Sequence, residues 1–171
     1  SFYACLFDVT AETTMFDVKT AFTFDGNGNH AGVAVESNMV YCPAEGNIFD
    51  VEDDVSFEVK HAVFSKDVSY LVADPHKDVC VQRDDDNYEI VPLTDELARA
   101  QGYVVRSKED RYYATVVELL AASGKTSVYL IDDVNEDIAV SGKAVQVYAG
   151  DYTYTGSVIL DDTRYFGAYS G

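Results

Sequence analysis

The chain has 171 residues, of which 30 are acidic and 12 are basic, so its formal net charge is −18. A chain of this length can bury a substantial core as one domain. A field of this sign repels phosphate backbones and anionic lipid headgroups, which excludes nucleic-acid binding and a polybasic membrane contact as working hypotheses. The 13 tyrosines and nine phenylalanines favour β-strands, because aromatic side chains fit a half-buried pleated surface.

The three cysteines, Cys5, Cys42 and Cys80, are too few and too widely spaced to predict a disulfide framework. Each lies beside apolar or aromatic residues, which is typical of buried free thiols and predicts a protein made in a reducing cytoplasm. One bridge between Cys5 and Cys42 is the alternative that the sequence leaves open.

No run approaches the roughly 20 apolar residues of a membrane span, and no charged, apolar-cored leader opens the chain. Ser1 is a small residue of the kind that removal of an initiator methionine exposes. A trimmed export signal or a cloning remnant would leave the same end. We therefore expect no membrane insertion.

Strand patterns occupy most of the first half of the chain. Residues 55–64 (VSFEVKHAVF) alternate apolar and polar side chains at their start, which is the period of a half-buried strand. Further strands are predicted at 16–24, 32–36, 68–73 and 79–82.

Residues 94–102 (TDELARAQG) predict a short helix. Thr94 can cap the free amides of the first turn, and Asp95 and Glu96 suit the positive end of the helix dipole. Gly102 can adopt the left-handed conformation that closes a helix.

Residues 111–121 (RYYATVVELLA) allow two interpretations. Glu118, Leu119 and the alanines are good helix formers. Tyr112, Tyr113 and the β-branched residues that follow them favour a strand, and this is the interpretation we adopt. The last strands are predicted at 126–131, 144–149, 152–155 and 157–160.

Two segments echo each other a short way apart in the chain. Ser123 to Tyr129 (SGKTSVY) and Ser141 to Tyr148 (SGKAVQVY) both place a tyrosine-bearing strand after a Ser-Gly-Lys turn. The offset between them is shorter than most solenoid or propeller repeats. We therefore interpret the echo as two hairpin edges made by the same turn chemistry.

Many short strands and one small helix predict a mainly β fold. We expect a single β-sandwich or barrel-like domain of antiparallel strands over residues 1–171, with one short helix at about 94–101. No proline- or serine-rich linker divides the chain.

One loop has features of a calcium site. Asp25, Asn27 and Asn29 place oxygen atoms at alternate positions of a turn, and Glu36 falls where the twelfth, bidentate ligand of a calcium loop lies. His30 replaces the glycine of the sixth position, and a Gly/Asn-rich hairpin tip explains the same residues. Calcium is thus the alternative to a protein that needs no cofactor.

Catalytic signatures are weak. Gly124 to Thr126 mimics the end of a phosphate-binding loop, but Leu119 stands where that motif requires glycine. Cys80 and His76 form a nucleophile pair only on paper, because no residue pattern indicates an activated thiolate. We predict no catalytic residue and expect a protein that is not an enzyme.

The last quarter of the chain is rich in aromatic residues. Tyrosine combines a large apolar area with a hydroxyl group and is favoured at interfaces. The sequence therefore predicts a protein–protein interface at Tyr152, Tyr154, Tyr165, Phe166 and Tyr169.

These features lead to a non-enzymatic structural or assembly protein as the first hypothesis, with a subunit of a viral or phage particle as its most concrete form. Its expected partners are protein subunits, in a homo-oligomer or a larger assembly. The alternative is a calcium-stabilised β binding module. A hydrolase with an unrecognised carboxylate or cysteine site is the second alternative.

Overall fold

The computed structural model describes residues 2–3, 7–8, 16–18, 22–25, 35–36, 39–41, 49–52, 55, 57–60, 62–85, 87–123, 127–162 and 165–169. It describes the backbone alone for those before 49 and for 57, 58, 60, 123, 165 and 166.

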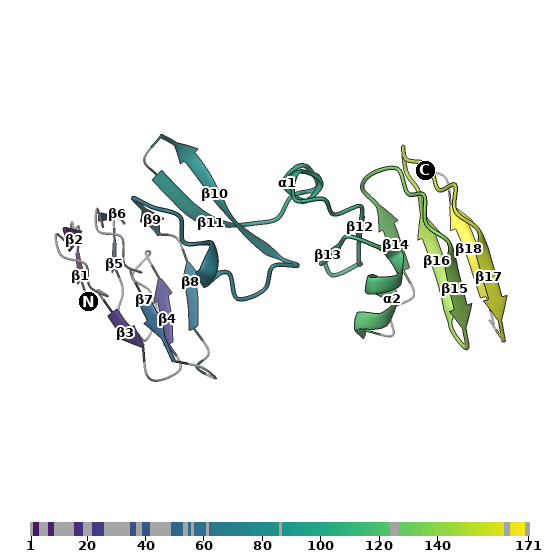
Figure 1. The fold of residues 1–171 in the computed structure, drawn as a ribbon, viewed down its shortest axis with the longest axis horizontal. Helices are drawn as coiled ribbons and strands as arrows, with labels where there is room; N and C mark the ends of the chain where they lie inside the picture. The colour runs from purple at the N-terminus through teal and green to yellow at the C-terminus, as the bar shows by residue number, and fades with distance from the viewer. Residues whose placement is uncertain are drawn as a thin grey trace. The chain divides into compact units, whose positions relative to one another are not determined.

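The described strands make the chain mainly β, as the sequence predicts. Contacts divide it into two compact units, an N-terminal unit, Ser1–Pro92, and a C-terminal unit, Leu93–Gly171 (Figure 1). The single domain over 1–171 stays a prediction.

The N-terminal unit pairs its early strands in parallel with later ones. Its strands are β1 (Phe2–Tyr3), β2 (Phe7–Asp8), β3 (Phe16–Val18), β4 (Phe22–Asp25), β5 (Val35–Glu36), β6 (Met39–Tyr41), β7 (Phe49–Val51), β8 (Phe57–Lys60), β9 (Val63–Phe64), β10 (Asp78–Asp84) and β11 (Asn87–Pro92). The strands β1, β2, β3 and β4 pair in parallel with β5, β6, β7 and β8 in the same order. Phe16, for example, lies opposite Phe49. The chain therefore coils, and the strands of one coil lie beside those of the next.

The core of the N-terminal unit gathers around Phe49 and Phe64, which are fully buried. Their rings meet edge to face with centroids 6.3 Å apart, a geometry that the quadrupole of aromatic rings favours. Beyond β9 the pairing changes to antiparallel, because β9 pairs with β11 and β11 pairs with β10. This hairpin confirms the strand predicted at 79–82.

The strand predicted at 68–73 is wrong. Residues Ser69–Leu71 form a 3-10 helix, η1. The Asp67 carboxylate accepts a hydrogen bond of 2.7 Å from the Ser69 amide, which turns the backbone locally. The same bond lowers the pKa of the Asp67 carboxyl.

The helix predicted at about 94–101 is confirmed as α1 (Asp95–Ala100). The Thr94 hydroxyl caps it by accepting a 3.2 Å hydrogen bond from the Leu97 amide. Gly102 closes it with φ of +84°, a conformation that glycine adopts without a steric penalty.

A second helix, α2 (Val116–Ser123), contradicts most of the strand that we preferred over 111–121. Only Tyr112–Tyr113 is a strand there. The Thr115 hydroxyl accepts from the Glu118 amide at 3.0 Å, and the Glu118 carboxylate accepts from the Ala114 amide at 3.2 Å. This pattern is a variant of the capping box, in which the Glu118 carboxylate reaches the amide of the residue before the N-cap. It starts a helix that β-propensity alone did not predict.

The C-terminal unit combines antiparallel and parallel pairing. Its strands are β12 (Val105–Arg106), β13 (Tyr112–Tyr113), β14 (Ser127–Leu130), β15 (Ile138–Ser141), β16 (Ala144–Tyr148), β17 (Val158–Asp161) and β18 (Tyr165–Tyr169). One sheet has the order β13-β12-β14-β16-β18, and β15 pairs with β17 in a second sheet. The pairs of β12 with β13 and β14 are antiparallel, whereas the pairs β14–β16, β16–β18 and β15–β17 are parallel.

The parallel pairs define coils of nearly constant length. Tyr129 lies opposite Tyr148, and Tyr148 in turn lies opposite Tyr169. In the second sheet, Val140 lies opposite Leu160 after a step of similar length along the chain. The strands that follow the two Ser-Gly-Lys segments, β14 and β16, therefore belong to successive coils. Our interpretation as hairpin edges is wrong, because these strands run parallel and stack in register.

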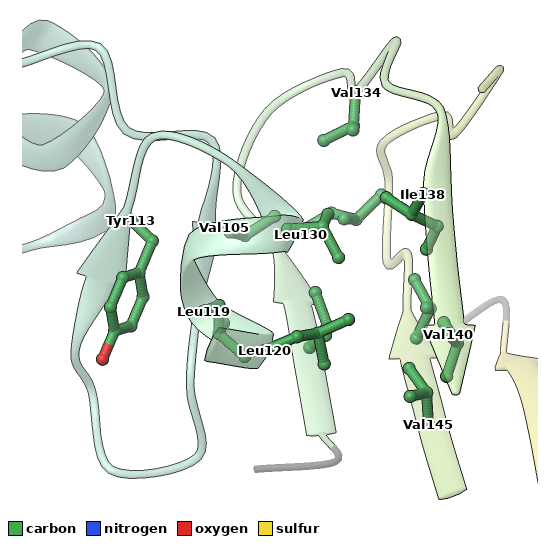
Figure 2. Close-up of a cluster of buried hydrophobic side chains, with 12 residues drawn as sticks. Val105, Tyr113, Leu119, Leu120, Leu130, Val134, Ile138, Val140 and Val145 are labelled. Carbon is green, nitrogen blue, oxygen red and sulfur yellow. The ribbon is translucent and has the colours of Figure 1, made fainter. Parts of the chain in front are cut away.

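The hydrophobic core of the C-terminal unit lies inside these coils. Alternate residues of each strand point inward, as in Val145 and Val147, which are buried. Leu119 and Leu120 of α2 pack onto this cluster (Figure 2). The helix and β12–β13 thus close one end of the coils, and β17 and β18 form the other end (Figure 1).

Candidate assembly surface at the open end of the C-terminal unit

A ladder of stacked side chains crosses four neighbouring strands. The Arg106 guanidinium carbon lies 4.9 Å from the centroid of the Tyr129 ring, within the range of a cation–π contact. The Tyr129 ring stacks on Tyr148 with centroids 4.6 Å apart, and Tyr148 stacks on Tyr169 at 5.2 Å. Parallel strands in register place identical positions directly above each other. We call these four residues the tyrosine ladder.

The first end of the ladder is closed by polar partners. Arg106 forms a 2.7 Å ion pair with Asp110 and a 3.4 Å contact with Asp95. The Tyr112 hydroxyl donates to the Asp95 carboxylate at 2.9 Å. Burial, together with this bond to a carboxylate, raises the pKa of Tyr112 to about 12. These groups hold Arg106 over the ring of Tyr129.

The last residue of the ladder, Tyr169, lies at an edge of the described sheet. Tyr169 lies on β18, the edge strand of the described sheet, and 42% of its surface is exposed. Its ring contacts Tyr148 on one side.

The same end exposes apolar side chains of β17. Val140, one coil earlier, is 2% exposed, whereas Leu160 at the equivalent position is 52% exposed. Ile159 is 64% exposed. The difference between Val140 and Leu160 arises because β17 covers β15, while no described strand covers β17. We call β17 and β18 together the open end.

Hydrogen bonds between loops connect consecutive coils of the C-terminal unit. Asp133 accepts a 2.8 Å hydrogen bond from the Thr153 amide in the next coil. Asp137 accepts from the Ser157 amide at 2.8 Å and from the Ser157 hydroxyl, and these bonds lower the pKa of the Asp137 carboxyl. These carboxylates replace ladder hydrogen bonds where the chain turns.

Two further contacts fix the register of the loops. A Cβ atom on Gly156 would lie 1.7 Å from the backbone oxygen of Glu136, so only glycine fits this approach. The Glu136 carboxylate accepts from the Val116 amide at 2.8 Å and from the Val117 amide at 3.2 Å. Glu136 therefore joins a coil loop to the first turn of α2, where the helix dipole favours a negative charge.

The structure distributes the five residues of the predicted interface over different settings. Tyr152 and Tyr154 are half-buried and pack against the core of their own unit. The Tyr152 hydroxyl accepts a 2.6 Å hydrogen bond from Arg99, and the Tyr154 hydroxyl donates to the backbone oxygen of Glu136. Burial and the nearby Glu136 raise the pKa of Tyr154.

The other three predicted interface residues, Tyr165, Phe166 and Tyr169, all lie on β18 and thus at the open end. Their role at an interface stays a prediction. The tail that carries them joins its own sheet through β16.

The predicted calcium ligands fall outside what the structure describes in full. Asn27 and Asn29 lie outside the described residues, Asp25 is the last residue of β4, and Glu36 is the last residue of β5. The calcium site stays a prediction, which melting in millimolar Ca²⁺ against EDTA tests directly.

Cys80 is a free cysteine on β10. Burial raises the pKa of its thiol, with a further contribution from the Asp67 carboxylate. A nucleophilic cysteine requires the opposite direction, because the thiolate is the reactive form. Within the described ranges, no group of three or more His, Cys, Asp or Glu side chains is arranged to hold a metal ion.

One sequence signal could have located β18 as a further coil position. The echo between 123–129 and 141–148 identifies two coil positions, and continuing it by one more step leads to Tyr169. Asp162, with φ of +46°, takes the turn position that Gly142 occupies with φ of +64°. The third copy lacks the Ser-Gly-Lys letters and is recognisable only by its strand.

No protein-family model, curated protein or solved structure matches this chain. Of the helices that the structure describes, none has the length and apolar character needed to cross a membrane.

Proposed function

We propose that this chain is a non-enzymatic structural or assembly protein, and that it assembles by adding a β-strand of another subunit to its open end. The observation that carries this proposal is the contrast between Val140, 2% exposed, and Leu160, 52% exposed at the same position of the last coil. Burial of such a side chain contributes about 1.5–3 kcal/mol.

Edge strands and uncovered coils are surfaces that proteins normally protect. An edge strand offers free amide and carbonyl groups that pair readily with another strand. The open end instead combines the edge strands β17 and β18 with Ile159, Leu160 and Tyr169. It therefore has the properties of a surface for strand addition.

The titratable groups of the C-terminal unit support a structural role. Asp133, Asp137 and Glu136 accept hydrogen bonds from backbone amides of neighbouring segments. Tyr112 has a pKa of about 12, far above the range in which a general acid or base works near neutral pH. Such groups hold the coils together and are poorly placed to exchange protons with a substrate.

The finer parts of this proposal concern the setting of the protein. Synthesis in a reducing cytoplasm is supported by the free thiol of Cys80. Incorporation into a viral or phage particle stays a prediction that follows from the assembly role.

The proposal is tested by the mass of the intact chain in solution between about 1 µM and 1 mM. An interface of standard size uses about 20–30 residues a side, and β17 and β18 supply nine. We therefore expect weak association, in which the average mass rises above the 18.8 kDa of one chain as the concentration increases. Light scattering after size exclusion and sedimentation velocity measure this. Both are run at low and high salt, because the charge of −18 opposes association when it is poorly screened. A strict monomer across the whole range would refute the assembly role.

A further inference from the structure

We infer that the partner at the open end is a second copy of this chain. It docks by its own open end, and β18 pairs antiparallel with β18 of the other copy around a two-fold axis. This inference rests on the proposed assembly role and adds the identity and geometry of the partner.

Coil length excludes a head-to-tail filament. Coils of the C-terminal unit return from Tyr129 to Tyr148 and from Tyr148 to Tyr169. The first coil of the N-terminal unit is longer: the chain starts at Phe2, passes through β1, β2, β3 and β4, and comes back beside Phe2 at Val35. The first coil of the N-terminal unit is therefore more than half as long again as the coils of the C-terminal unit. A coil of the C-terminal unit cannot continue the strand register of this longer coil. The surface with a matching cross-section is the open end of another copy.

The opposite end of the C-terminal unit does not offer a matching surface. Leu119 and Leu120 of α2 pack into the core there, and β13 borders the sheet with both of its tyrosines buried. Self-association through one patch on each copy is isologous and closes at two subunits. The structure therefore favours a closed dimer over an open fibre.

The sequence of β18 is self-complementary in this arrangement. The strand has the letters YFGAY, with Gly167 at its centre. Antiparallel pairing centred on Gly167 places Tyr169 opposite the partner's Tyr165 and Phe166 opposite the partner's Ala168. Cross-strand aromatic pairs contribute roughly 0.2–1 kcal/mol each. A large residue opposite a small one also fills space evenly.

Charge supports a second copy as the occupant. The strand β18 and the segment Val158 to Leu160 contain no charged residue, although the whole chain carries −18. Like charges directly across an interface cost several kcal/mol. Two copies can therefore meet at β18 and at Val158 to Leu160 without placing like charges directly opposite each other there.

The limited size of this surface sets the expected strength. Nine strand residues a side are fewer than the about 20–30 of a standard interface. We therefore expect a dissociation constant in the range of about 10 µM to 1 mM, the range of weak and transient interfaces.

Cysteine cross-linking tests the two-fold axis. Residues facing each other in an antiparallel pair have Cα atoms about 4.5–5.5 Å apart, within the span of a disulfide. In a chain whose Cys5, Cys42 and Cys80 are replaced by serine, Gly167→Cys should give a disulfide-linked dimer on mild oxidation. The control is Val117→Cys on α2, which is 50% exposed at the closed end and should stay monomeric.

A second pair of variants tests the interface without cross-links. Leu160→Lys should lower the association constant at least about tenfold, because it places a charge inside the closed dimer. Val117→Lys should leave association unchanged, because Val117 lies on α2 at the closed end. It is a matched control, since its exposure of 50% is close to the 52% of Leu160. Circular dichroism of all variants shows whether the fold is kept.

The outcomes separate the two proposals. A Gly167→Cys dimer without a Val117→Cys dimer, together with loss of association in Leu160→Lys, supports the two-fold arrangement. Association beyond two copies overturns the two-fold arrangement. So does association that Leu160→Lys does not weaken and in which Gly167→Cys forms no disulfide. Either result leaves the assembly role standing. A wild-type chain that is monomeric at every concentration overturns both.

Discussion

At one end of the C-terminal unit the inward-facing side chains are covered by α2 and by β12–β13, whereas at the other end β17 and β18 leave comparable side chains exposed. Leu119 is fully buried at the closed end, and Leu160 is 52% exposed at the open end. The coils between them repeat the same register. The two ends therefore differ in what covers them, and the difference shows that the packing of a coil depends on the neighbour stacked on it.

The largest effect is expected where the coils approach most closely. Gly156→Ala should destabilise the C-terminal unit by more than about 4 kcal/mol, because the new Cβ atom would lie 1.7 Å from a backbone oxygen that cannot move alone. Unfolding in urea, followed by circular dichroism, measures the change. Gly142→Ala is the control, since a Cβ atom there has open space and only its φ of +64° costs about 1–2 kcal/mol. Equal costs for the two variants would break the account of closely stacked coils, and with it the comparison of the ends.

A pair of leucine truncations compares the two ends directly. Leu119→Ala should cost about 2–5 kcal/mol, as expected for a buried leucine that leaves a cavity. Leu160→Ala should cost less than about 1 kcal/mol in the monomer, because half of its surface is already in water. Urea unfolding at low protein concentration gives both values. A Leu160→Ala cost as large as that of Leu119→Ala would mean that the open end is covered within the monomer.

The cap of α2 provides a smaller and more local test of the closed end. Glu136→Ala removes the acceptors of two helix amides and should cost about 1–2 kcal/mol. It should also lower the pKa of Tyr154, which the nearby carboxylate raises. Absorbance titration of the tyrosines measures the second effect. A stability loss with an unchanged titration curve would argue against an electrostatic effect of the Glu136 carboxylate on Tyr154.

The last effect is expected only in alkaline solution. Tyr112 has a pKa of about 12 in the folded chain and about 10 in an unfolded one. Because the folded state holds this proton more tightly, its contribution is complete below pH 10 and is lost as the pH rises towards 12. Tyr112→Phe should therefore flatten the fall in unfolding free energy over this interval. The same slope in wild type and variant would exclude Tyr112 as its source.

Local chemistry made part of the fold predictable from sequence. Thr94 and Gly102 mark the ends of α1, and both act as their residue types predict. The sequence also contained the capping box of α2, Thr115 with Glu118 three residues later. The β-branched and aromatic residues nearby favour a strand instead, but a helix packs Leu119 and Leu120 into the core.

Long-range pairing was less predictable. The strands look alike whether they form hairpins or stack as coils, because alternation reports which side chains are buried and not which strand lies alongside. Parallel register is visible only in repeats such as Tyr129, Tyr148 and Tyr169. The candidate assembly surface follows from that register. The aromatic residues of β18 could thus be identified from sequence, but the open end could not.

The most direct test of the account is amide hydrogen exchange measured at low and high concentration of the intact chain. In the monomer, the amides of β18 that face away from β16 have no strand to pair with among the described residues. Pairing with a second copy should slow their exchange as concentration rises, while exchange in α2 stays unchanged. Protection that is the same at both concentrations, or that increases at α2 instead, would contradict assembly through the open end.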